Sequence, residues 1–228
     1  MHPLLLKKGS ELDVGRSMRR FMIYAIGVFV LAFGISLQNE SGLGTAAFTC
    51  FADTLSLLFG TSLGFMLTVT YVVYVLIQIL IQQKNFKPRI LLEFGFSAVM
   101  GFLTDFFSAV LPIQPSGFPA QVVTMICSIV VTAVGVSIVV GMDIVPNPSD
   151  GLVQVIAEKM NKRFGDVKVV LDISHVAASL LLSMLFLHDF GGFGLTTLLS
   201  ALFLGKTING VNKLFGLRLQ KMVFNYSE

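Results

Sequence analysis

The stretch FMIYAIGVFVLAFGISL, residues 21–37, contains no charged side chain and directly follows Arg19 and Arg20. A helix needs about 20 apolar residues to cross the hydrocarbon core of a bilayer, so this stretch predicts a membrane span over residues 20–37. Five further stretches are also predominantly apolar and long enough: 62–82, 90–110, 120–141, 168–187 and 192–212. Of all 228 residues, 54% are hydrophobic and only 13% are charged. The sequence therefore predicts an all-α membrane protein with six transmembrane helices.

The positive charges predict the orientation of these spans. Lys and Arg gather in a basic arm (1–19), after the second span, after the fourth span and in the tail (213–228). The loops 38–61, 111–119 and 188–191 contain neither. Because cytoplasmic loops are enriched in Lys and Arg, we expect a multi-pass protein with both termini in the cytoplasm.

The chain also resembles itself at an offset of 101 positions. AFGISL at 32–37 aligns with AVGVSI at 133–138, and both halves run through a span, a short helix and two more spans. Because each half has three spans, the second half enters the membrane from the opposite side, as in the inverted repeats of secondary transporters. We expect these repeats at 20–110 and 120–212. The alternative is that any six-span protein divides into three plus three.

Each repeat is expected to contain an extra short helix, at 45–59 in the first and at 148–164 in the second. The second follows Asn147, a natural N-cap, and Pro148, which suits the first helical position. As amphipathic helices, both could lie flat on the membrane surface. As re-entrant helices, both would point their N-termini at a central cavity, where free N–H groups and the helix dipole suit an anionic group.

Polar residues on the short helices and inside the spans are the candidate site residues, because burying them in a membrane is costly. The expected substrate-binding residues are Asn39, Thr45, Thr49, Asp53, Asn147, Ser149, Asp150, Gln154 and Lys206. Candidates for proton or ion coupling are Asp172, His175 and Asp105, of which the first two share a helix face. Lys206 and Asp172 fall at similar depth, which favours an ion pair. Glu93 and Asp172 also suit a purely interfacial position, and His175 suits simple packing.

No motif in the sequence indicates an enzyme or a cofactor. A phosphate loop, CxxC, HExxH and a nucleotide fingerprint are all missing. The three His are scattered, and the two Cys imply no disulfide framework. We therefore expect no catalytic residues, no cofactor, no metal and no nucleic-acid partner. The expected partners are the lipid bilayer and a small polar or anionic substrate, and a homodimer stays open.

The segment AFGISLQNESGLGTAAFTCFADTLSLLFGTSLG, residues 32–64, resembles the opening signature of the bacterial YczE/YyaS/YitT membrane proteins. The Leu43-Gly44 pair and the turn at 61–64 carry the likeness. Asp53 lies a few residues beyond the position of that family's acidic residue. The resemblance covers about residues 20–212. It implies a transporter of the bacterial cytoplasmic (inner) membrane and names no substrate.

Together, these observations predict a small-molecule transporter with a central site between two inverted repeats, coupled to an ion or a proton. A substrate-binding membrane subunit, or a non-transporting accessory membrane protein that acts with partners, is the alternative. The apparent duplication favours the transporter.

Overall fold

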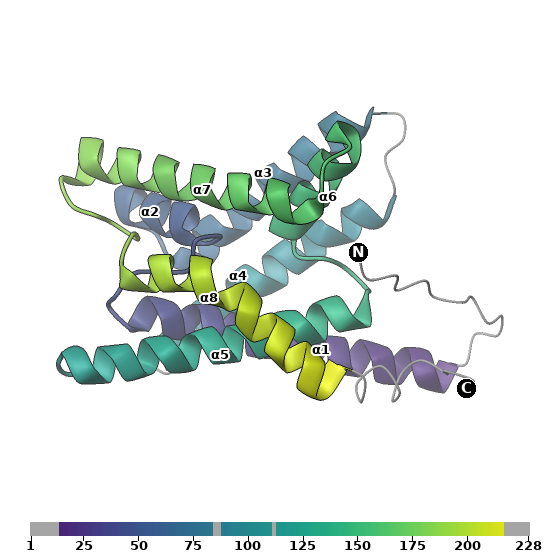
Figure 1. Ribbon diagram of the computed structural model, residues 1–228, viewed down its shortest axis with the longest axis horizontal. Helices are drawn as coiled ribbons and strands as arrows, with labels where there is room; N and C mark the ends of the chain where they lie inside the picture. Colours follow the sequence, from purple (N-terminus) through teal and green to yellow (C-terminus); the bar gives the residue numbers. More distant parts are fainter. Residues whose placement is uncertain (1–13, 84–87, 111–112, 217–228) are drawn as a thin grey trace.

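The computed structural model describes residues 14–83, 88–110 and 113–216, and all regular structure in these residues is helical (Figure 1). Most of the basic arm and tail, and the loop residues 84–87, lie outside the described residues. The helices are α1 (Val14–Glu40), α2 (Cys50–Phe59), α3 (Leu63–Gln82), α4 (Leu92–Val110), α5 (Phe118–Met142), α6 (Pro148–Met160), α7 (Phe164–Leu182) and α8 (Leu195–Val211). A 3₁₀ turn, Pro88–Leu91, precedes α4, and π-helical turns, Ser183–Leu187 and Asn212–Gly216, extend α7 and α8.

Five helices are long and apolar enough to cross a membrane, and they coincide with the first five predicted spans. They are Ser17–Glu40, Leu63–Gln82, Pro88–Val110, Phe118–Met142 and Phe164–Leu187. The protein is therefore a multi-pass integral membrane protein. The sixth expected span, 192–212, corresponds to α8, which has 17 residues. Since a spanning helix needs about 20 residues, a crossing by α8 and its π-helical extension stays a prediction.

Helices α1 and α5 lie along each other at the lower edge of the view in Figure 1. Helix α4 packs against α1, and α8 packs against α5. Helix α3 packs against α4 and α6, while α7 packs against α2 and α6. Two glycines allow the closest approach of α1 and α5. A Cβ on Gly34 would lie 2.8 Å from the backbone of Thr132, and one on Gly135 would lie 2.6 Å from that of Leu31.

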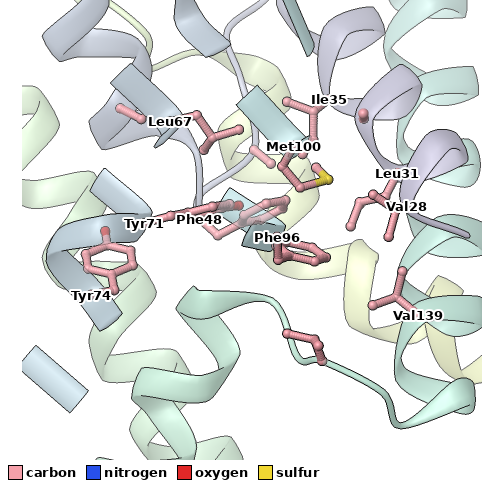
Figure 2. Packing of buried hydrophobic residues seen from close by; sticks show 14 of the residues in the cluster. Val28, Leu31, Ile35, Phe48, Leu67, Tyr71, Tyr74, Phe96, Met100 and Val139 are labelled. Atoms are coloured by element: carbon pink, nitrogen blue, oxygen red, sulfur yellow. The ribbon is translucent and has the colours of Figure 1, made fainter. Parts of the chain in front are cut away.

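The apolar core lies among α1, α3, α4 and α5 (Figure 2). Leu31 and Ile35 of α1 meet Leu67 and Tyr71 of α3 and Met100 of α4, and all five are at most 1% exposed. The lipid-facing sides of the helices carry the exposed apolar residues. This core holds α3 and α4 against α1 and so fixes one wall of the cavity described below.

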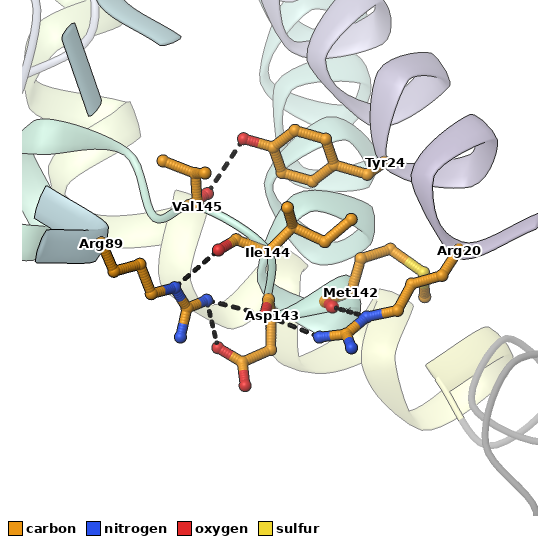
Figure 3. A network of polar contacts seen from close by, with 7 residues as sticks. All are labelled: Arg20, Tyr24, Arg89, Met142, Asp143, Ile144 and Val145. Atoms are coloured by element: carbon orange, nitrogen blue, oxygen red, sulfur yellow. Dashed lines mark hydrogen bonds and ion pairs between the residues drawn. The ribbon is translucent and has the colours of Figure 1, made fainter. Parts of the chain in front are cut away.

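Side chains from other elements satisfy the irregular backbone between α5 and α6 (Figure 3). Arg20 donates to the carbonyl oxygens of Met142 and Asp143 at 2.6 and 2.7 Å. Arg89 donates to the carbonyl and the carboxylate of Asp143 at 2.6 and 2.9 Å, and Tyr24 donates to a carbonyl further on. Two cations thus meet the negative end of the α5 dipole, and the position where α6 begins is fixed.

Candidate binding cavity

A cavity of about 780 Å³ opens at the end of the molecule where α6 begins. Its wall consists of the C-terminal parts of α3, α5 and α8, the N-terminal parts of α4 and α7, and α6 itself. The polar side chains that line it are Gln78, Gln82, Arg89, Glu93, Asp143, Asn147, Asp150, Gln154, Glu158, Lys168 and Asn209. A cavity of this size is large enough for a small organic molecule. Three predicted binding residues, Asn147, Asp150 and Gln154, lie on its wall.

The N-terminus of α6 is buried at this cavity. The predicted cap at Asn147 is confirmed, because its Oδ1 accepts from the backbone N–H of Ser149 at 3.0 Å. Its Nδ2 donates at 3.2 Å to the hydroxyl of Tyr71, which is fully buried on α3. Ser149 itself lies behind the wall, and its buried hydroxyl has no hydrogen-bond partner among the described residues. The last three residues of α6, 158–160, are exposed, in contrast.

Glu93 of α4 and Gln78 of α3 form a buried pair on the cavity wall. Their side chains are 2% and 1% exposed. Gln78 Nε2 donates to Glu93 Oε2 at 2.7 Å and to the carbonyl oxygen of Pro148 at 3.3 Å. A Cβ on Gly151 would lie 2.9 Å from Gln78 Oε1 and from both carboxylate oxygens of Glu93. Only glycine therefore lets α6 pack so close to this pair.

Glu93 was not among the predicted site residues. A carboxylate inside an apolar span was the available signal, but an interfacial position explained it equally well. Arg89, four residues earlier, also offers a partner at helical spacing. In the structure Arg89 turns to Asp143 instead (Figure 3). Glu93 is thus left with no ion pair to any described residue.

Lys168 of α7 is a second residue that sequence reasoning missed, because it was counted among the cytoplasmic positive charges. Its Nζ lies 3.0 Å from Asp150 Oδ1 on α6 and 3.5 Å from Asp172 Oδ1 one turn along α7. All three side chains are about one-quarter exposed, at 27%, 25% and 23%. This triad connects α6 to α7 at the cavity wall. The expected pairing of Asp172 with Lys206 is replaced by pairing with Lys168.

The two residues expected to act together in proton coupling have separate partners. Asp172 belongs to the Lys168 triad, whereas His175 Nε2 lies 2.7 Å from the hydroxyl of Tyr74. The His175 ring stacks on Tyr74, with ring centroids 5.3 Å apart, and it also faces Phe51 of α2. His175 lies outside the cavity lining. Its environment is that of a packed residue between α2, α3 and α7.

Asp105 and Lys206 also lie away from the cavity. Asp105 accepts from the Ser62 hydroxyl at 2.6 Å and from the backbone N–H of Gly64 at 2.8 Å, and so caps the N-terminus of α3. Lys206 is exposed on α8, with its Nζ 5.4 Å from the centre of the Phe203 ring. Asp105 thus has a structural role at the opposite end of α3 from the cavity.

The candidates from the first repeat lie outside the cavity lining, and two of them, Thr45 and Asp53, pack against the segment that leads into α8. The four candidates are Asn39, Thr45, Thr49 and Asp53. The backbone N–H of Thr45 donates to Gly192 at 3.1 Å, and its hydroxyl lies 3.4 Å from the carboxylate of Asp53. The backbone of Gly192 covers this carboxylate. Burial raises the pKa of Asp53 to about 6.

The fold and the cavity define a multi-pass helical membrane protein with a polar cavity at one end. Residues 18–213 match a family described as a family of unknown function (DUF6198). The chain belongs to this family. No curated protein and no solved structure was found to match the chain. The likeness to the YczE/YyaS/YitT proteins stays a resemblance in sequence motifs.

Proposed function

We propose that this protein transports a small polar molecule across the bacterial cytoplasmic membrane, and that the cavity is its substrate site. The observation that carries the proposal is the cavity of about 780 Å³, on whose wall Gln78 and Glu93 are buried in two helices long and apolar enough to cross a membrane. It opens at the end where Arg89 and Lys168 lie and which the positive charges assign to the cytoplasm. The protein therefore faces inward in this conformation.

The helix packing supports an inverted repeat. At the offset of 101 positions, α1 to α4 correspond to α5 to α8 in order. The packing of α4 on α1 then corresponds to that of α8 on α5, and the packing of α6 on α3 to that of α2 on α7. Gly34 and Gly135, which align in the two repeats, both lie where α1 meets α5. Such a repeat gives two related conformations, one open to each side.

One pair of helices breaks this correspondence. Helices α3 and α4 pack tightly, because Gly64 and Gly101 bring the two backbones into contact. Their counterparts α7 and α8 diverge toward the cavity (Figure 1). A Cβ on Gly165 of α7 or Gly205 of α8 would meet no atom within 4 Å. Closing α7 on α8 while α3 and α4 separate would move the opening to the outer side.

Single cysteines at Gln154 and Thr68 test this proposal, with Cys50 and Cys127 replaced by alanine. Gln154 is exposed in the cavity, whereas Thr68 lies in the closed seam, where its hydroxyl donates to the backbone of Gly64 at 2.9 Å. A membrane-impermeant thiol reagent is added to inside-out and right-side-out vesicles. We expect fast labelling of Gln154→Cys from the cytoplasmic side and slow labelling of Thr68→Cys from the outside.

Thr61→Cys, in the exposed turn before α3, is the positive control for the outer side. If the outside reagent labels this control and never labels Thr68→Cys, the protein does not alternate between two open states. A substrate-binding subunit or an accessory protein would then be the better assignment.

A further inference from the structure

Acidic side chains outnumber basic ones around the cavity. Its lining contains the carboxylates of Glu93, Asp143, Asp150 and Glu158 and the cations of Arg89 and Lys168. Arg89 pairs with Asp143 at 2.9 Å, and Lys168 is shared between Asp150 and a further carboxylate, Asp172. No described cation pairs with Glu93 or Glu158. Among the described lining residues, four carboxyl side chains thus accompany two cations.

The two unpaired carboxylates have different surroundings. Glu158 is exposed at the end of α6, where it accepts from Gln154 Nε2 at 3.0 Å. Glu93 is 2% exposed, and only its Oε2 accepts a hydrogen bond from a described residue, Gln78. A buried carboxylate in a membrane is costly unless a proton or a cation neutralises it. Glu93 is therefore the group in the cavity with the strongest need for a cationic ligand.

Hydrogen-bond acceptors converge beside Glu93. The amide nitrogen of Gln78 is already used, so its Oε1 is left as an acceptor. This oxygen and both carboxylate oxygens of Glu93 lie close together on the cavity wall, each 2.9 Å from the position that a Cβ on Gly151 would take. A primary ammonium group carries a positive charge and three N–H donors, and it complements such a cluster of oxygens.

We infer that the cavity binds a small organic cation through its primary ammonium group, with Glu93 as the counter-ion and Gln78 Oε1 as a second acceptor. This inference rests on the proposed function, because it names the substrate class of the same site. The N-termini of the short helices alone suggest an anionic group. In the cavity, however, Asn147 already accepts from the first turn of α6, and acidic side chains outnumber basic ones among the described lining residues.

Protection of a single cysteine at Gln154 measures this binding. The full-length protein in membranes is labelled with an uncharged methanethiosulfonate reagent in the presence of butylamine, butanol or butyrate. These probes have the same chain length and differ in charge, and butylamine is protonated at neutral pH. At about 10 mM, which suits ligands this small, butylamine should slow labelling about fivefold, while butanol and butyrate have little effect. Labelling at Thr61→Cys should be unchanged by all three.

Two variants remove one carboxylate each. Glu93→Gln keeps the shape and the hydrogen bond to Gln78 and removes the charge, so protection by butylamine should be lost. Glu158→Gln removes an equal charge from the exposed end of α6, where solvent screens it, and should weaken protection less than about threefold. The labelling rate without probe shows whether the cavity of each variant is intact.

The comparison of the three probes tests the inference even if Glu93→Gln does not fold. Equal or stronger protection by butanol or butyrate would overturn the inference and leave transport of another solute class intact. Protection by none of the probes, or equal loss in the two variants, would also overturn it. Two-sided labelling at Gln154 and Thr68 is a separate measurement, so a failure of the transport proposal is seen independently.

Discussion

Helices α3 and α4 pack along each other as a closed pair, whereas α7 and α8, which align with them at the offset of 101 positions, form an open pair that separates toward the cavity (Figure 1). In the closed pair, the Gly64 backbone contacts that of Gly101, and Asp105 caps α3 across the seam. In the open pair, Gly165, which aligns with Gly64, faces the cavity. The comparison shows that aligned glycines can allow close helix packing in one half and line an open space in the other.

The two short helices differ in the same way. Asp53 of α2 aligns with Gln154 of α6 at the offset of 101 positions. Asp53 is 6% exposed beneath the backbone of Gly192, while Gln154 is exposed in the cavity. The segment that leads into α8 covers α2, and none of the described segments covers α6 in the same manner. The candidate site is therefore assembled around one short helix instead of between both.

The largest expected effect comes from alanine at the two aligned glycines. Gly64→Ala should lower the free energy of unfolding by about 3 kcal/mol, because its Cβ would overlap the Gly101 carbonyl and the Asp105 carboxylate. Gly165→Ala should leave stability unchanged or raise it by up to about 1 kcal/mol, because the site has open space. Unfolding in detergent, followed by circular dichroism, measures both. Equal losses would mean that both seams are packed in the protein.

Replacement of Lys168 should have the next largest effect. It aligns with Leu67, which is fully buried in the closed half. Lys168→Gln leaves Asp150 and Asp172 without their shared cation and should cost about 2 kcal/mol in the same unfolding measurement. Lys168→Arg keeps the charge and should cost less than half as much. Stability unchanged by the glutamine would show that the triad does not hold α6 to α7.

Valine at the open glycines should prevent closure of the cavity. In the double variant Gly165→Val and Gly205→Val, branched side chains fill the gap between α7 and α8 and hold the inward-facing state. Labelling of Thr68→Cys from the outside should fall about tenfold, which corresponds to about 1.4 kcal/mol. Gly95→Val, also in open space but on an exposed face of α4, is the control. If labelling is unchanged in the double variant, the space between α7 and α8 does not need to close when the outer side opens.

The smallest expected effect is the pH dependence contributed by Asp53. Its pKa is raised to about 6 in the folded state by burial, so the unfolded state loses this proton at lower pH. The folded state is therefore favoured below pH 6 and loses stability as pH rises through 6. Between pH 5.5 and 7.5 this amounts to about 1 kcal/mol. Asp53→Asn should reduce the change of the free energy of unfolding with pH. An unchanged pH dependence would show that Asp53 is not a buried, protonated carboxyl group in the folded state.

Local sequence was sufficient to place most of the helices. The start of α3 at Leu63, the start of α6 at Pro148 and the end of α4 at Val110 fall within two residues of the predicted boundaries. These features depend on hydropathy over about 20 residues or on a cap and its near neighbours. The same local hydropathy showed that the chain belongs in a membrane.

Much of the candidate site depended on contacts between residues remote in the chain. Sequence spacing could not show that Arg89 pairs with Asp143, 54 positions away, and leaves Glu93 alone on the cavity wall. It could not show that Tyr74, 101 positions before His175, holds that ring apart from Asp172. Side chains select such partners only after the helices pack. The sequence by itself thus determined the helices and their polar residues, and only tertiary packing decided which of them share a cavity and which end is open.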